Sequence, residues 1–201
     1  MNIDLNRTFS MRTQILTGVA CGFLELLANS LQKYFNSMPL FIDTLFTITA
    51  SFFGGISGII SAVMYHFLSK VLYAHTLLSL SWTAVSLTIV LIIRLYVRAR
   101  REFTAIDIVL LSFIVGIAIS AEGALISCIL HIFTDYREDM PVRQMYFFLK
   151  SNGIPMFICA LLPRVPINLL DKGICVPLGF LVYTGARRFI PAQKNNSCET
   201  C

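Results

Sequence analysis

The sequence predicts an all-α membrane protein, a single bundle of six transmembrane helices over residues 1–190. Three observations predict this fold class. Hydrophobic residues make up 56% of the 201 residues and charged residues only 13%, against about a quarter charged in an ordinary soluble domain. The mean hydropathy is +0.74. Because each span needs about 20 mostly apolar residues, the chain has room for about six spans and for little else.

The first three expected spans come from a long N-terminal apolar region. The first covers 12–35 and ends at the polar segment 36–39. Because it carries Glu25 and lacks a small-residue cleavage site, we expect a retained helix and not a signal peptide. The apolar stretch that follows is too long for one upright helix. Two adjacent glycines interrupt it with the backbone freedom that a tight hairpin needs, which predicts spans over 40–53 and 56–72.

The other three expected spans lie in the C-terminal half, over 76–97, 105–133 and 167–189. Pro166, just before the last of them, suits a first helical turn because its missing N–H would be unpaired there anyway. Pro177 predicts a kink inside the same span.

Two segments fall outside these spans. The stretch 142–162 contains Pro155 and the charged residues Arg143 and Lys150, which predicts a short re-entrant or surface-lying element. Residues 191–201 are polar and predict a disordered tail. That tail ends in Cys198 and Cys201, whose C-x-x-C spacing is weak evidence for metal or redox chemistry. The other cysteines lie in apolar runs and indicate no disulfide framework.

The distribution of Lys and Arg predicts that both chain ends lie in the cytoplasm, by the positive-inside rule. The predicted cytoplasmic side holds Arg7, Arg12, Arg94, Arg98, Arg100, Arg101, Arg187, Arg188 and Lys194. The first and third connections, on the other side, hold only Lys33 and Lys70. The connection before the last span is an exception, with Arg137, Arg143, Lys150 and Arg164 outside, and ligand binding is the alternative reason for its charges. This distribution explains the net charge of +5 without a nucleic-acid partner.

Polar side chains within the apolar segments are the candidate functional residues. An ionised side chain at the bilayer centre costs roughly 3 kcal/mol on insertion scales, so an intramembrane acid is a functional candidate by default. We expect these side chains to turn inward and bind a substrate. The candidate substrate-binding residues are Asn29, Asp43, Glu122, His131, Asn168, Asp171 and Lys172.

Several of these residues also suit a structural role. Glu25 and Asn29 share a helical face with two glycines, which indicates either a polar site or a packing seam that tolerates one acid. Asp43 also suits a cap at the start of the second span. His131 at the end of the fifth span suits an interfacial position better than a metal site. Glu122, nearest to the middle of that span, is hardest to explain structurally.

The run that leads into the last span offers the same choice. Asp171 and Lys172 can form a structural salt bridge. Asn168 shares a face with Asp171 and adds donors and acceptors that a salt bridge does not need. This favours a polar pocket mouth that faces the preceding loop.

Glycines at regular spacing predict close helix contacts, because small residues let helix backbones approach each other in a membrane. Five of them are expected to form a helix-packing or coupling interface: Gly18, Gly22, Gly54, Gly55 and Gly58.

The motifs of common enzymes are missing from the sequence. It has no phosphate-binding glycine loop, no nucleophile elbow and no His-Glu-x-x-His arrangement. We therefore expect no enzymatic activity, no cofactor and no metal.

The pattern resembles the substrate-binding (S) components of energy-coupling factor transporters. The likeness rests on six helices with both ends inside, on Gly18 and Gly22 in the first helix, and on the hairpin segment 52–58. It covers most of the chain as architecture.

The resemblance implies a protein of the bacterial cytoplasmic membrane that takes up a vitamin or similar micronutrient with a separate coupling subunit and ATPases. It also implies a ligand site toward the outer side. Carried onto this chain, that site holds Glu122, His131, Asn168, Asp171 and Lys172, with Asp43 and Asn29 approaching from the early helices.

A second hypothesis is a sensory or structural membrane module that partners a signalling protein. Six-helix bundles of similar appearance precede signalling domains in bacterial receptors. Co-purification with a signalling partner, and not with a transporter subunit, would favour it.

Overall fold

The computed structural model describes residues 9–35, 44–73, 80–100, 103–133 and 142–190, which form seven helices. Five of them are long and apolar enough to cross a membrane. These five are α1 (Met11–Phe35), α3 (Gly55–Tyr73), α4 (Trp82–Ala99), α5 (Ala105–Phe133) and α7 (Met156–Ala186). The chain is therefore a polytopic α-helical membrane protein, as its composition predicts.

The second helix, α2 (Leu45–Phe53), is a half-helix. Its 9 residues extend about 14 Å at 1.5 Å per residue, against about 30 Å for the hydrocarbon core. The sequence predicts a span over 40–53, but 40–43 lie outside the described residues and the helix that is present cannot cross. Nearly every side chain of α2 is buried, because α1, α3, α4 and α7 all pack against it.

α2 and α3 form the antiparallel hairpin that the two glycines predict, with its turn at Gly54. Ser51 on α2 lies against Gly58 on α3, and further along Thr47 Oγ1 lies 3.2 Å from Ser61 Oγ. The backbone at Gly54 is extended (φ 169°), so its conformation does not require glycine. A Cβ at Gly54 would meet the end of the flexible Gln14 side chain on α1, which would have to move.

The last long helix starts earlier than the sequence predicts. The expected span begins at 167, whereas α7 begins at Met156 and contains Pro163, Pro166 and Pro177 within it. Prolines are tolerated inside membrane helices where neighbouring helices satisfy the freed backbone groups. The stretch 142–162 accordingly divides into the short helix α6 (Val142–Ser151) and the first turns of α7, with Gly153 at a positive φ of 75° between them.

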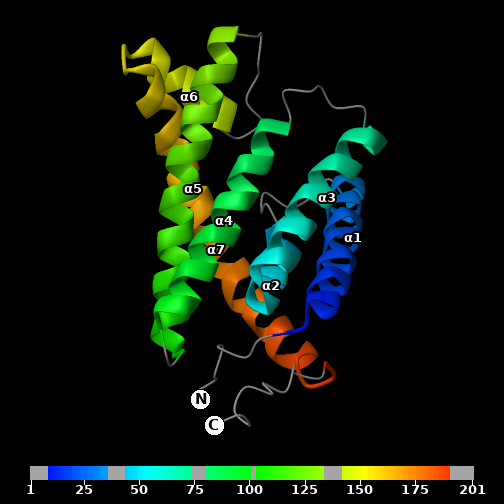
Figure 1. Cartoon of the computed structure of the whole chain (residues 1–201). Helices are drawn as coiled ribbons and strands as arrows, with labels where there is room; N and C mark the ends of the chain where they lie inside the picture. Colours follow the sequence, from blue (N-terminus) through cyan, green and yellow to red (C-terminus); the bar gives the residue numbers. More distant parts are fainter. Residues whose placement is uncertain (1–8, 36–43, 74–79, 101–102, 134–141, 191–201) are drawn as a thin grey trace.

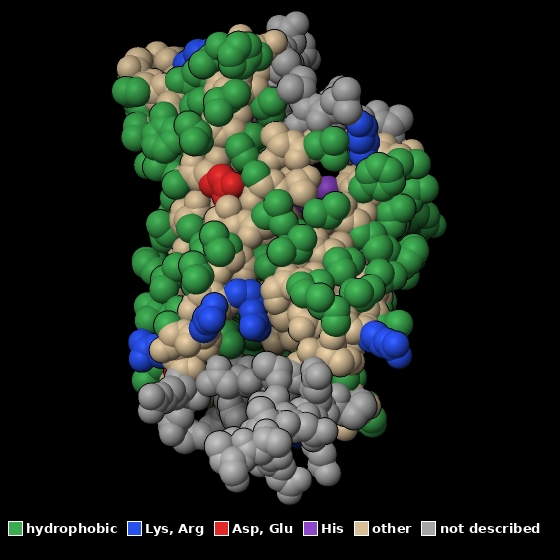
Figure 2. Space-filling view, in the orientation of Figure 1, with side chains coloured by type: hydrophobic (Ala, Val, Ile, Leu, Met, Phe, Trp, Pro, Cys, Tyr) green, Lys and Arg blue, Asp and Glu red, His purple; other side chains and the backbone are tan. Residues whose placement is uncertain are grey.

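The helices run alternately up and down, and the first turn of α1 lies at the same end of the bundle as the last turn of α7 (Figure 1). The end of α4 and the start of α5 lie at this end too (Figure 1). Figure 2 shows Lys and Arg side chains gathered toward it and hydrophobic side chains over the middle of the visible face. We call it the basic end, after Arg12, Arg94, Arg98, Arg100, Arg187 and Arg188.

Aromatic packing fills the core near the basic end. Phe52 at the end of α2 lies edge-on to Phe180 of α7, with ring centroids 5.5 Å apart. Phe53 packs against Tyr183 at 4.9 Å. The same hydrophobic core continues to Ile48 and Ile119, and buried polar side chains lie beside it around the other end of α2.

Candidate functional site: a buried polar cluster at the start of α2

Seven buried side chains from α1, α3, α7 and the start of α2 gather at mid-depth of the bundle. Asp171 is the middle residue of the 31-residue α7, so the cluster lies about midway along this helix. We call this group the central polar cluster: Glu25, Thr44, Thr47, Ser61, Asp171, Lys172 and Cys175.

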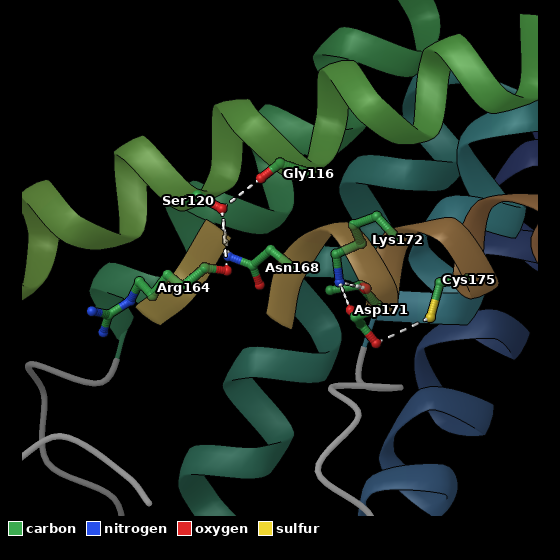
Figure 3. A network of polar contacts seen from close by, with 8 residues as sticks. Gly116, Ser120, Arg164, Asn168, Asp171, Lys172 and Cys175 are labelled. Carbon is green, nitrogen blue, oxygen red and sulfur yellow. Dashed lines mark hydrogen bonds and ion pairs between the residues drawn. The ribbon is translucent and has the colours of Figure 1, made fainter. Parts of the chain in front are cut away.

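Lys172 is the cation of the cluster. It is only 2% exposed, and its ammonium pairs with the carboxylate of the adjacent Asp171. It also donates a hydrogen bond of 2.6 Å to Thr44 Oγ1, at the cap position of α2. Figure 3 shows Asp171 between Lys172 and Cys175, whose Sγ lies 3.5 Å from Asp171 Oδ1. The Asp-Lys contact is therefore a buried pair that ties α7 to the start of α2.

Glu25 brings a second carboxylate from α1. Its side chain is 0% exposed, and Oε2 accepts a hydrogen bond of 2.6 Å from Thr47 Oγ1. Thr47 in turn contacts Ser61 on α3. Thr44 and Thr47 are three residues apart, so one turn of α2 connects the acid of α1 to the ion pair of α7.

The orientation of α2 suits the carboxylate of Glu25. The N-terminal end of a helix carries a partial positive charge and its C-terminal end a partial negative charge. Glu25 accepts from Thr47 in the first turn of α2, whereas the Lys172 ammonium at Thr44 is balanced by the carboxylate of Asp171. Arg94 of α4 lies at the other end, with Nη1 3.4 Å from the carbonyl oxygen of Ser51. Half-helices with buried N-termini form substrate and ion sites in many transporters.

A second polar contact joins α5 and α7 one helical turn further from the basic end. Asn168 Nδ2 donates to Ser120 Oγ at 3.0 Å, and Ser120 also bonds the carbonyl oxygen of Gly116 at 2.7 Å (Figure 3). Ser120 is 3.5 Å from the carbonyl oxygen of Arg164 as well. Ser120 of α5 thus contacts α7 on both sides of Pro166.

Arg164 is not in an outer loop, as the sequence predicts, but inside α7 and buried. Its guanidinium donates to Ser127 Oγ at 2.6 Å and to the Ala160 carbonyl at 3.0 Å. It also lies over the ring of Trp82, 5.8 Å from the centroid. The early start of α7 explains the difference, because it moves Arg164 from the loop into the span.

The predicted substrate-binding residues do not form one group. Asp171 and Lys172 lie in the central polar cluster, and Asn168 lies one turn away on α7. Asn29 instead donates to the Tyr65 hydroxyl between α1 and α3. His131 Nδ1 lies 2.9 Å from the Ser127 carbonyl, and its ring stacks on Tyr146 at 5.1 Å.

Two further predicted residues stand apart from the cluster. Glu122 is half-buried, and its Oε2 has no hydrogen-bond partner among the described residues. Asp43 lies outside the described residues. The sequence indicates Glu25 as part of a polar helical face, but only the structure shows that it meets Thr47 of another helix.

The predicted packing glycines make contacts within the chain. A Cβ at Gly18 would lie 2.7 Å from the backbone oxygen of Ser57, and one at Gly22 would lie 3.3 Å from that of Ser61. A Cβ at Gly58 would meet Ser51 and Val90 at 2.7 Å. Gly18 and Gly22 therefore join α1 to α3.

Comparisons with known proteins assign this chain to no family. No protein-family model matches the chain, and neither the curated proteins nor the solved structures include one that is significantly similar to it. Among the described residues, no group of three or more His, Cys, Asp or Glu side chains could hold a metal ion. The fold and the site define the class as a multi-pass α-helical membrane protein with a buried ionisable cluster.

Proposed function

We propose that the chain is the membrane-embedded substrate-binding component of a small-molecule uptake transporter of the bacterial cytoplasmic membrane, working with separate coupling and ATPase subunits. The central polar cluster carries this proposal. It places two carboxylates, an ammonium and three hydroxyls at mid-depth, all buried. Ionisable side chains inside a membrane are costly and commonly mark substrate or ion pathways.

A structural role for a single ion pair would need fewer groups. Replacing a buried ion pair by well-packed apolar residues is often neutral or stabilising, so stability alone gives little reason to place charges here. The cluster also lies at the buried start of a half-helix, where the backbone N–H groups of the first turn are not used by the helix itself. These features support a site whose polar groups exchange their hydrogen-bond partners when a ligand enters.

The charges of the cluster suggest a class of substrate. Glu25, Asp171 and Lys172 together carry one excess negative charge when all three are ionised. A positive group on a ligand would be attracted by this excess of carboxylates. We therefore expect the ligand to be a small polar molecule that carries a positive group, with polar atoms that can replace Lys172 at Thr44.

The test is ligand retention by the purified full-length chain. Native mass spectrometry of gently extracted protein should detect a bound small molecule, and a panel of vitamins and metabolites should include compounds that raise the thermal unfolding temperature. Bound ligand stabilises a protein by mass action, by about 2.7 kcal/mol at a hundred times Kd. A panel without any stabilising compound, together with an empty protein, would refute the proposal.

A matched pair of variants assigns the ligand to the cluster. Thr47 and Thr49 are both buried on α2, but Thr47 bonds Glu25 whereas Thr49 bonds only the carbonyl of Leu45 on its own helix, at 2.9 Å. Thr47→Val should weaken the ligand-induced stabilisation, and Thr49→Val should retain it. Equal losses in both variants would place the ligand elsewhere.

A further inference from the structure

The short helix α6 has apolar side chains on two faces. Val142, Tyr146 and Leu149 point inward and are buried. Phe147 and Phe148 on the other side are 57% and 68% exposed. A surface helix in water normally has one apolar face and one polar face, so the outward side of α6 needs an apolar neighbour.

The position of α6 limits what that neighbour can be. α6 packs against α7, at the end of the bundle opposite the basic end (Figure 1). The flanking helices have 29 and 31 residues and reach about 43 to 46 Å at 1.5 Å per residue. This length matches the roughly 40–45 Å of the hydrocarbon core plus both headgroup regions, which places α6 at the level of the headgroups.

The outward face of α6 continues the lipid-facing surface of the spans. Phe157 and Ile158 at the start of α7 are exposed, as are Ile132 and Phe133 at the end of α5. Figure 2 shows hydrophobic side chains over this end of the bundle that extend down the side of the long helices. The lipid that surrounds the spans can therefore also cover the outward face of α6.

The charges of α6 are of one sign. Its sequence, VRQMYFFLKS, contains Arg143 and Lys150 and no acid. Lys150 is exposed and lies over the ring of Tyr146, 5.7 Å from the centroid. Basic side chains beside aromatic ones are typical of helices that lie in a membrane interface, where they reach the phosphates.

We propose that α6 is an interfacial helix that binds the phospholipid surface at this end of the bundle. Phe147 and Phe148 enter the boundary between headgroups and acyl chains, and Lys150 contacts headgroup phosphates. The buried side of α6 packs against the spans, because Tyr146 stacks on His131 at the end of α5. This inference does not depend on the proposed transport function.

The test measures the depth of α6 in a bilayer. The sole native tryptophan, Trp82, is replaced by Phe, and Phe148→Trp or Phe147→Trp is introduced into the full-length chain. Asn152→Trp, at an exposed position in the turn after α6, is the control. Each variant is reconstituted into phosphatidylcholine vesicles with or without bromine on the upper acyl chain.

The tryptophan at 148 or 147 should lose more than about half of its fluorescence to brominated lipid, as expected for a side chain in the acyl boundary. It should be little quenched by iodide, whereas the control at 152 should show the opposite pattern. Iodide quenching of all three positions would overturn the proposal. Protection from both quenchers would overturn it too, because another protein surface, such as a second copy of the chain, would then cover α6.

Discussion

Thr47 on α2 donates its hydroxyl hydrogen to Glu25 on α1 across 2.6 Å, in a place that solvent does not reach. The bond joins the half-helix to the first span at the same level as the ion pair of α7. Because Thr47 also contacts Ser61, its one hydroxyl group links α2 to both α1 and α3. The relationship gives the first prediction.

Thr47→Val should destabilise the protein by about 1–3 kcal/mol, the cost of leaving a buried polar group without its hydrogen bond. Valine keeps the shape and removes only the hydroxyl. Thr49→Val should cost less, because its hydroxyl bonds only a carbonyl of its own helix. Thermal unfolding in detergent compares the two variants with the parent. Equal destabilisation would mean that the bond from Thr47 to Glu25 contributes no more to stability than the bond of Thr49 within its own helix.

Lys172→Met should destabilise the protein by about 3–5 kcal/mol, because it leaves the carboxylate of Asp171 buried without its ammonium partner. The double variant Asp171→Leu with Lys172→Met removes both charges and should recover much of the loss. The measurement is a double-mutant cycle of unfolding free energies. If the changes in unfolding free energy of the two single substitutions simply add in the double variant, the ion pair does not couple Asp171 to Lys172.

Gly18→Ala should destabilise the contact between α1 and α3 by about 1–3 kcal/mol, the usual cost of overpacking. The new methyl group would lie 2.7 Å from the backbone oxygen of Ser57, which cannot rotate away. Gly173→Ala is the control, since a Cβ there meets no atom within 4 Å. It should be neutral or slightly stabilising, because alanine favours a helix by up to about 1 kcal/mol over glycine. The thermal unfolding temperatures of the two variants separate these effects, and a stable Gly18→Ala protein would contradict the packing.

The basic end should face the cytoplasm, because loops rich in Lys and Arg remain on that side. Ala99→Cys at the end of α4 and Ser151→Cys at the end of α6 are exposed positions at opposite ends. In a background without native cysteines, a membrane-impermeant maleimide added to intact cells should label position 151 and leave position 99 unlabelled until the membrane is opened. The reverse pattern would invert the topology.

The sequence predicts the membrane class and most of the long helices correctly, because apolar length is a direct requirement of the bilayer. It does not predict that α2 is a half-helix. Its apolar stretch matches a span by composition, and the true length depends on α1, α3, α4 and α7 enclosing it on all sides. Such enclosure is a tertiary property, and the hydrophobic periodicity of the sequence does not reveal it.

The start of α7 is wrong in the sequence-based prediction for a related reason. Pro166 is interpreted as a first-turn residue by its usual helix preference, but α7 continues through it. Ser120 and Ser127 of α5 bond groups on these turns. A rule that considers one helix at a time misses this support from a neighbour.

The candidate site is predicted in part. Asp171 and Lys172 are correctly placed next to each other, but at the centre of the helix and not at its outer end. Glu25 is recognised as an intramembrane acid without its connection to Thr47. The polar stripes show which face of each helix turns inward, and the rotation and depth of several helices together decide which stripes meet.

The contact between Lys172 and Thr44 joins residues that are 128 positions apart. At about 5–20 residues per second, a ribosome makes α7 about 6 to 25 s after α2. A segment of 9 residues is too short to hold itself across a bilayer. During synthesis α2 must therefore wait, held by its hairpin with α3, until the last helix arrives with its lysine. Assembly of the helices around α2 should accordingly require α7, and nascent chains halted before α7 should remain open to proteases near α2.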